Sequence, residues 1–147
     1  RGYKLFANKL WNVSRFIIDA THDYPADTLP ALSEADSKIL STLTDVVTNV
    51  TNHMEKFQFH IAGEEIYHYI WHELADKVLE ESKIVLQQNE ADPLGRPARQ
   101  HILNVCLTTS LRLLHPFMPF VTETIWQHLP KNIPKENDFL MVAKWPK

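Results

Sequence analysis

Four long segments of this chain repeat apolar residues every three to four positions, and that spacing constrains the fold more than any other feature. Such a period places apolar side chains on one face of an α-helix. The segments cover residues 2–20, 33–57, 61–86 and 102–114, and prolines or turn-forming residues separate them. No strand-helix-strand alternation accompanies them, so the sequence predicts an all-α helical bundle and no nucleotide-binding Rossmann core.

The second and third segments carry the clearest local signals. Ser33 and Asp36 resemble a capping box with Asp in place of Glu. The seam that follows alternates by three and four and consists of Ile39, Leu43, Val46, Val50, His53 and Phe57. The third segment is apolar over a wider face, so we expect it at the centre of the bundle. Its stripes are Ile66, Ile70, Leu74 and Val78, with Tyr67, Trp71, Ala75 and Leu79 beside them.

The last third of the chain is interrupted by prolines. A loop is expected from Asn89 to Pro97, and Pro116 and Pro119 break the fourth helix because proline lacks the N–H donor. A short helix is predicted over Val121–Leu129, and one short extended segment over Phe139–Trp145. The prediction is therefore a single domain, residues 1–147, of four long helices, a short fifth helix and an irregular or extended C-terminal tail.

Composition excludes several classes of protein. With 147 residues and 44% hydrophobic content, the chain can bury the core of one globular domain. The net charge of −3 argues against a basic coat for sequence-blind nucleic-acid binding, and no apolar run approaches the roughly 18 residues of a membrane span. The single Cys106 excludes an internal disulfide and is expected in the core. Because the chain starts at Arg1, we expect a domain excised from a longer protein.

The first helix has two chemically different faces. On a wheel of about 100° per residue, the core side consists of Tyr3, Phe6, Leu10, Val13, Ile17 and Ala20. The opposite side consists of Lys4, Asn8, Trp11, Asn12, Arg15 and Asp19, which predicts Trp11 at the centre of a polar face. Lys9 falls on the flank of the helix, near Phe16.

That polar face has the chemistry to bind unpaired nucleotides. An asparagine amide both donates and accepts, an arginine offers a fork of donors, and an indole stacks on a base. In the alternative, Trp11 packs under a neighbouring helix or domain, Asn12 bonds to a loop backbone, and Lys9 pairs with an acid. Packing is the commoner role of an aromatic residue on a helix, so residue types alone leave this alternative open.

Other chemically suggestive groups favour ordinary structural roles. His68 and His72 are four residues apart, but Asp76 stands where a metalloprotease helix requires its second histidine, so we predict no metal site. Two sets of basic residues are expected to lie on solvated faces, the second set being nearer to a phosphate-binding role. These are Arg96, Arg99 and Arg112, and Lys131, Lys135, Lys144 and Lys147. No residue has a sequence context that suggests catalysis.

Several motifs together resemble one known family. Residues 8–16, Asn-Lys-Leu-Trp-Asn-Val-Ser-Arg-Phe, resemble the helix that opens the anticodon-binding domain of valyl-tRNA synthetases. The group Phe57, Gln58, Phe59, Ala62, Tyr67, Tyr69 and Trp71 resembles the third helix of that domain. Residues 113–126 are similar to its fourth helix and break, and residues 142–146 to its end. The resemblance spans the whole chain, and it departs from the family at Asp76-Lys77-Val78, where many members have an aromatic after the Asp.

The motifs differ in how narrowly they indicate a function. The His-Pro-Phe-Met-Pro-Phe run is shared by several class Ia synthetases, whereas Asn-Lys-Leu-Trp-Asn favours the valine enzyme. The resemblance implies a non-catalytic, metal-free segment that binds the anticodon stem-loop of tRNA(Val). Its parent, a cytoplasmic enzyme, would attach valine with ATP and magnesium in a catalytic domain of the same polypeptide, without contact to membrane or DNA. The implied tRNA-binding residues are Lys4, Asn8, Lys9, Trp11, Asn12 and Arg15. The alternatives are an isoleucyl- or leucyl-tRNA synthetase domain, or a helical protein-interaction module without RNA contact.

Overall fold

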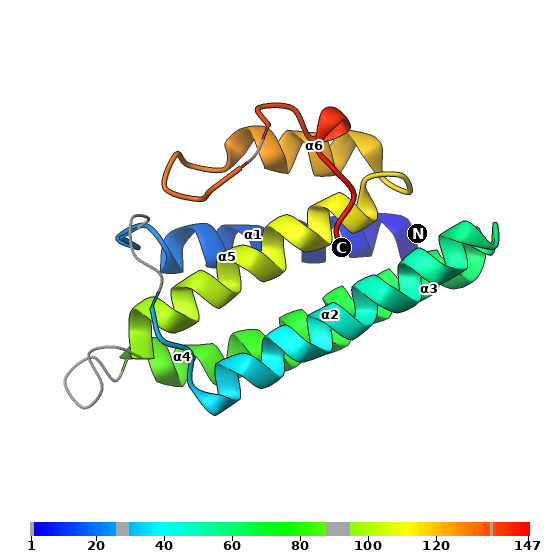
Figure 1. The fold of residues 1–147 in the computed structure, drawn as a ribbon. Coiled ribbons are helices and arrows are strands. Elements are labelled where there is room, and N and C mark those ends of the chain that lie inside the picture. Colours follow the sequence, from blue (N-terminus) through cyan, green and yellow to red (C-terminus); the bar gives the residue numbers. More distant parts are fainter. Residues whose placement is uncertain (1, 26–29, 88–94, 136) are drawn as a thin grey trace.

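The computed structural model describes residues 2–25, 30–87, 95–135 and 137–147, and it is all-α throughout these residues (Figure 1). The α-helices are α1 (Gly2–Ala20), α2 (Glu34–Glu55), α3 (Phe59–His68), α4 (Leu79–Gln87), α5 (Gly95–Leu114) and α6 (Pro119–His128). A π-helical segment, η1 (Tyr69–Val78), joins α3 directly to α4, and a short 3-10 turn, η2 (Leu140–Val142), lies near the C-terminus. The predicted all-α class is confirmed.

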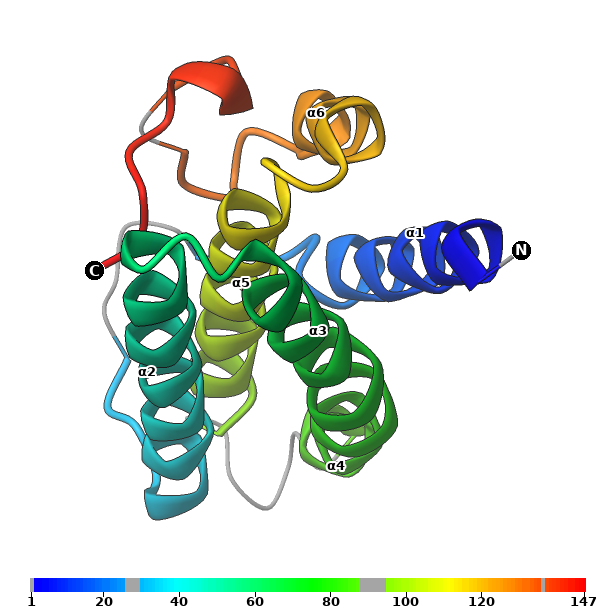
Figure 2. The same cartoon turned by 90° about the vertical axis from the view of Figure 1, so that its right-hand side faces the viewer.

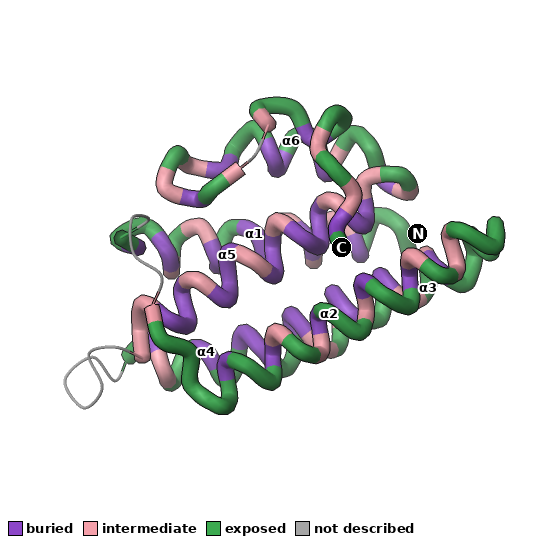
Figure 3. Tube along the Cα trace, in the orientation of Figure 1, coloured by how far each residue is buried: buried purple, intermediate pink, exposed green. Residues whose placement is uncertain are grey.

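The helices are arranged around α5. On one side of α5, α2 lies alongside the continuous rod formed by α3, η1 and α4; α1 and α6 cover the other side (Figures 1 and 2). The tube coloured by burial shows purple along most of α5 (Figure 3). The expectation that the third predicted helix is central was therefore wrong. Buried polar residues, including Arg99, Gln100 and Asn104, interrupt the apolar pattern of α5 and conceal its central position in the sequence.

The break between α5 and α6 lies where the prolines predict it, since α5 ends at Leu114 and α6 begins with Pro119. Proline is tolerated at the first position of a helix because its missing N–H has no intrahelical acceptor there. The expected single extended segment over Phe139–Trp145 is interrupted by η2 at Leu140–Val142, whereas Phe139 and Ala143 on either side of it are extended. The carboxylate of Glu123 on α6 accepts backbone hydrogen bonds from Leu140 and Met141 at 2.8 and 3.1 Å, which favours this turn. Residues 89–94 of the predicted Asn89–Pro97 loop lie outside the described residues, and the remainder of the prediction was wrong, because α5 already begins at Gly95.

The predicted capping box at the start of α2 is confirmed. Asp36 N donates to Ser33 Oγ, and Ser33 N donates back to Asp36 Oδ2, both at 3.1 Å. The other carboxylate oxygen of Asp36 accepts from Arg99 Nε at 2.8 Å, and both side chains are almost fully buried. Arg99 also donates to Ser82 Oγ, on α4, at 3.1 Å. One carboxylate thus caps α2 and ties it to α5, so the expectation of a solvated Arg99 was wrong.

Three apolar residues do not lie where the periodic pattern places them. Tyr3, in the first turn of α1, is 61% exposed although the pattern places it on the core side. Val47 is buried in α2 together with Val50, whereas Val46 is only partly buried. Phe57 is 79% exposed because α2 ends at Glu55, and Phe57 adopts a left-handed backbone conformation with φ 60° in the turn to α3.

Candidate nucleic-acid interface

The outward side of α1 carries polar side chains in adjacent turns, with the exposed carboxylate of Asp19 near its C-terminal end. The core side of α1 consists of Phe6, Leu10, Val13 and Ile17, which are buried against the neighbouring helices. Lys4, Asn8, Asn12 and Arg15 are all exposed on the opposite side. We call these four residues the α1 polar face. No hydrogen bond or ion pair within the described residues occupies their side chains, so their polar groups point to solvent.

Trp11 lies at the border of this face and not at its centre. Its side chain is half-buried and packs against the edge of the hydrophobic core. Its ring meets the imidazole of His128 on α6 almost perpendicularly, with ring centroids 5.7 Å apart. The predicted central position was wrong, because at about 100° per residue Trp11 falls at one end of the arc of polar residues. There α6 packs alongside α1 and covers one flank of the indole.

Lys9 is separated from the other predicted residues. Its Nζ lies 3.4 Å from Asp76 Oδ1 and 5.3 Å from the centre of the Trp71 ring, on the side of α1 that faces η1. The ion pair and the cation–π contact give Lys9 a structural role, as the alternative interpretation of the sequence allowed. The structure thus brings together Lys4, Asn8, Asn12 and Arg15, places Trp11 beside them, and turns Lys9 away.

His128 is a neighbour of the α1 polar face that the sequence analysis did not select. Its Nδ1 lies 2.8 Å from the backbone oxygen of Thr124, one turn earlier in α6, and the side chain is exposed. No local motif marks this histidine, because its proximity to Trp11 depends on how α6 packs against α1. The sequence alone offers no signal that identifies it.

The segment after α6 is joined to the end of α1. Asn132 Nδ2 donates to the backbone oxygens of Thr21 and His22 at 2.7 and 3.2 Å. This contact holds the chain around the exposed Lys131 close to the C-terminal end of α1. The polar surface of α1 is therefore flanked along one side by α6 and by the segment that follows it.

This surface can donate and accept hydrogen bonds without first breaking internal ones. The asparagine amides match the edges of bases, and the guanidinium of Arg15 and the ammonium of Lys4 match phosphate or carbonyl oxygens. The exposed part of Trp11 adds an aromatic edge at the border. A surface of this kind suits an unpaired, single-stranded nucleic acid better than a duplex, because the edges of unstacked bases are accessible.

Several of the other basic residues, including the three arginines selected from the sequence, are engaged within the fold. Besides Arg99, Arg96 Nη2 lies 2.8 Å from Asp23 Oδ1, and Arg112 Nη1 donates to the backbone oxygen of Lys144 at 3.3 Å. Lys135 Nζ donates to the backbone oxygen of Trp126 at 3.2 Å. Lys131, Lys144 and Lys147 are exposed. The three arginines therefore do not form a shared basic patch.

The remaining titratable side chains form no reactive cluster within the described residues. The rings of His68 and His72 lie 4.8 Å apart, but those residues contain no group of three or more histidine, cysteine or carboxylate side chains placed to hold a metal ion. Cys106 is completely buried, and this burial raises the pKa of its thiol to about 11. A thiol that stays protonated at neutral pH is a poor nucleophile. No described helix is both long and apolar enough to cross a bilayer.

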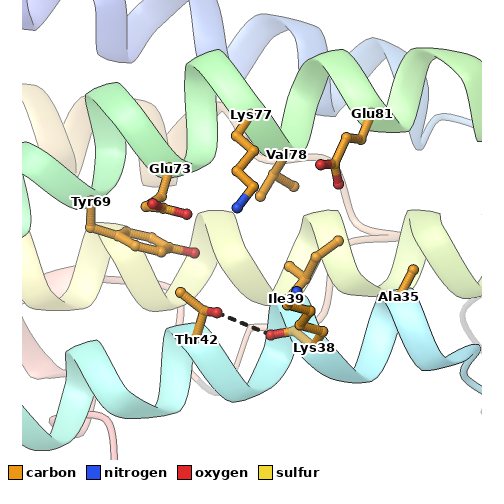
Figure 4. A pocket seen from close by; sticks show the side chains of 9 residues that line it. All are labelled: Ala35, Lys38, Ile39, Thr42, Tyr69, Glu73, Lys77, Val78 and Glu81. Atoms are coloured by element: carbon orange, nitrogen blue, oxygen red, sulfur yellow. Dashed lines mark hydrogen bonds between the residues drawn. The ribbon is translucent and has the colours of Figure 1, made fainter.

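A pocket of about 250 Å³ lies between α2 and η1, away from α1 (Figure 4). Lys38 and Thr42 of α2 and Tyr69, Glu73 and Lys77 of η1 line it. Thr42 Oγ1 is already bonded to the backbone oxygen of Lys38 at 3.1 Å. This pocket contains none of the residues selected from the sequence as candidates for binding.

Comparison with known proteins gives consistent matches. Residues 36–147 match the family model described as the anticodon-binding domain of tRNA ligase. The valine–tRNA ligase of Pseudothermotoga lettingae is 40% identical over 98% of this chain, and that of Thermotoga maritima is 41% identical over 99%. The enzyme of the same name from Bacillus thuringiensis is 39% identical over 96% of the chain.

These matches extend over both parts of the candidate interface. The family model includes α6 but begins after α1, whereas the alignments with the ligases also include α1. The chain spans 16% of the length of these relatives. Since the family model covers most of the chain and agrees with its all-α fold, the chain belongs to the family of anticodon-binding domains of tRNA ligases.

Proposed function

We propose that this chain binds the anticodon stem-loop of tRNA(Val) through the α1 polar face, and that it does so as one domain, residues 1–147, of a valine–tRNA ligase. The observation that carries the proposal is the clustering of Asn8, Asn12 and Arg15 on one exposed, internally unpaired surface of a chain that belongs to an anticodon-binding family. The similarity to valine–tRNA ligases over nearly the whole chain favours valine as the amino acid.

The chain contributes recognition and not bond-making chemistry in this proposal. A base whose donors and acceptors match the asparagine amides exchanges its hydrogen bonds with water for equivalent ones. A mismatched base leaves a desolvated polar group unpaired, at a cost of about 1–3 kcal/mol. Arg15 and Lys4 neutralise phosphates of the loop backbone, and Trp11 supports a neighbouring base at the border of the face. Lys9 is not part of this surface.

The remainder of the ligase would carry the chemistry. A catalytic domain of the same polypeptide would activate valine with ATP and magnesium and would esterify it to the distant acceptor end of the tRNA, in the cytoplasm. When this chain binds the anticodon stem-loop, it orients the tRNA so that the acceptor end reaches the catalytic domain. The partners proposed for this chain are thus the tRNA and the catalytic domain, with neither DNA nor membrane among them.

The experiment compares two cations of the same helix. Arg15→Ala and Lys9→Ala each remove one positive charge from α1, but only Arg15 lies on the α1 polar face. The binding of an RNA hairpin with the tRNA(Val) anticodon stem and loop is measured by fluorescence anisotropy at several salt concentrations. We expect Arg15→Ala to weaken binding by about tenfold or more, since hydrogen bonds to charged groups contribute about 1.5–3 kcal/mol. It should also reduce the slope of log affinity against log salt concentration by about one, the change expected when one phosphate contact is lost.

Lys9→Ala is expected to leave the hairpin affinity within about twofold of the unmodified chain. Equal losses for the two variants would indicate attraction by net charge alone and would refute the proposed face. Stronger binding of hairpins from isoleucine or leucine tRNAs would reassign the amino acid. No preference for any of these hairpins over a scrambled RNA would favour a protein-interaction module instead.

A further inference from the structure

The contact between α1 and α6 brings a histidine whose Nδ1 is a hydrogen-bond donor to the edge of the α1 polar face. His128 Nδ1 lies 2.8 Å from the backbone oxygen of Thr124. A carbonyl oxygen only accepts hydrogen bonds, so Nδ1 must carry the proton in this contact. In the neutral imidazole, Nε2 then has a free lone pair and acts as an acceptor.

The surroundings of His128 keep Nε2 available. The side chain is exposed, and its ring meets Trp11 nearly at right angles, with an interplanar angle of 82°. An edge-to-face contact of this kind, together with the bond to Thr124, restricts the rotation of the imidazole. Neither of these two contacts uses Nε2 in a hydrogen bond. In its neutral form, His128 therefore presents an ordered acceptor beside the half-buried indole.

The cations of the α1 polar face leave an acceptor role unfilled. Lys4 and Arg15 can only donate, which suits phosphates and base carbonyls but not the amino and imino groups of bases. The amides of Asn8 and Asn12 can accept, but they lie further around α1 from α6 than Trp11 does. An acceptor on the α6 side of Trp11 therefore complements the donors on α1.

We propose that His128 is a specificity-determining residue of this RNA surface, and that its Nε2 accepts a hydrogen bond from the amino or imino group of a loop base that lies against Trp11. The inference rests on the proposed function and deepens it, because it names a second helix and the kind of base edge that it recognises. Phosphate, which has no N–H group, is excluded as the partner of a neutral His128.

Two substitutions of similar size separate the two nitrogens. The amide of asparagine reaches roughly the position of Nδ1, and that of glutamine the position of Nε2. His128→Gln can place an acceptor oxygen where the proposal needs one, whereas His128→Asn removes it and keeps a donor toward Thr124. With the hairpin of the tRNA(Val) anticodon stem and loop as probe, we expect His128→Asn to weaken binding about two- to tenfold, the usual range for one hydrogen bond. His128→Gln should recover most of the affinity.

Base analogues then distinguish a direct contact from an indirect effect on Trp11. Each adenosine or cytidine of the loop is replaced in turn by an analogue without its exocyclic amino group, each guanosine by inosine and separately by 1-methylguanosine, and each uridine by N3-methyluridine. At the contacted position, the analogue should weaken binding to the unmodified chain but cause no further loss with His128→Asn, because the same hydrogen bond is already absent. A purely structural role would instead give additive losses at every position.

The outcomes also separate this inference from the proposed function. If Arg15→Ala weakens binding while His128→Asn stays within about 1.5-fold of the unmodified chain, the α1 surface stands and the role of His128 is refuted. Additive losses at every loop position would refute it as well. If the hairpin binds no better than a scrambled RNA, the proposed function fails together with the inference. The indole N–H resonance of Trp11 and the thermal midpoint of each variant show whether the packing of Trp11 is preserved.

Discussion

Replacing Asp36 by alanine tests how the fold is held together, because a single carboxylate caps α2 and neutralises a buried arginine. Asp36→Ala removes the acceptors for Ser33 N at 3.1 Å and for Arg99 Nε at 2.8 Å. Loss of a helix cap typically costs about 0.5–2 kcal/mol. Breaking a buried ion pair by removing one partner costs about 3–5 kcal/mol, because the remaining charge stays buried without compensation.

We therefore expect Asp36→Ala to reduce the free energy of unfolding by at least about 3 kcal/mol, a large part of the 5–15 kcal/mol of an ordinary domain. The thermal midpoint should fall by roughly 10 °C. Urea unfolding followed by circular dichroism at 222 nm, a wavelength that reports helix content, measures the change directly.

Two control variants isolate the buried charge. Ser33→Ala disrupts the cap but leaves the Asp36–Arg99 pair, so it should cost only about 1 kcal/mol. The double variant Asp36→Leu with Arg99→Met replaces both charges by apolar side chains and should recover much of the loss, since buried ion pairs are often replaceable as pairs. An Asp36→Ala variant no less stable than Ser33→Ala would refute the argument that the Asp36–Arg99 pair contributes more to stability than the helix cap does.

Two further predictions concern titratable groups outside the candidate interface. Burial alone would raise the pKa of the Glu123 carboxyl, but hydrogen bonds from the backbone N–H groups of Leu140 and Met141 outweigh it and hold this pKa below its usual value of 4.5. The contribution of the ionised Glu123 to stability is therefore complete above pH 4.5 and is lost as the pH falls through the lowered folded-state pKa. Glu123→Gln should thus destabilise the chain more at pH 7 than at pH 3, as measured by urea titrations at the two pH values. Burial raises the pKa of Cys106 to about 11, so the folded chain should not react with a thiol reagent at pH 8 until urea unfolds it. Rapid labelling of the folded chain would contradict the burial of this thiol.

The sequence predicts the helices of this fold better than their arrangement. Apolar periodicity, the Ser33–Asp36 pattern and the prolines at 116 and 119 are local signals, and the start of α2 and the break between α5 and α6 lie where these signals place them. The central position of α5 has no such signal, because its buried polar residues reduce the apparent amphipathicity. Neither the π-helical winding of η1 nor the end of α2 before Phe57 is indicated by residue spacing.

In the candidate interface too, features that depend on one helix are predictable from the sequence, and features that depend on contacts between helices are not. A helical wheel correctly predicts that Asn8, Asn12 and Arg15 share an exposed side of α1, since this depends on the helix alone. It cannot predict the surroundings of Trp11 or Lys9, which come from other helices. Asp76 on η1 pairs with Lys9, and His128 on α6 meets Trp11. These two partners are 67 and 117 positions away in the chain, a separation at which no local pattern indicates contact.

Nuclear magnetic resonance titration tests the central claim most directly, because it locates the RNA on the protein without altering either. The side-chain signals of asparagine, arginine and tryptophan are followed as the hairpin with the tRNA(Val) anticodon stem and loop is added to the labelled chain. The account predicts the largest shifts for the amides of Asn8 and Asn12 and the Nε–H of Arg15. The indole N–H of Trp71, whose ring contacts Lys9, should shift less. Shifts confined to α2 and α3, with unchanged side-chain signals on the α1 polar face, would contradict it.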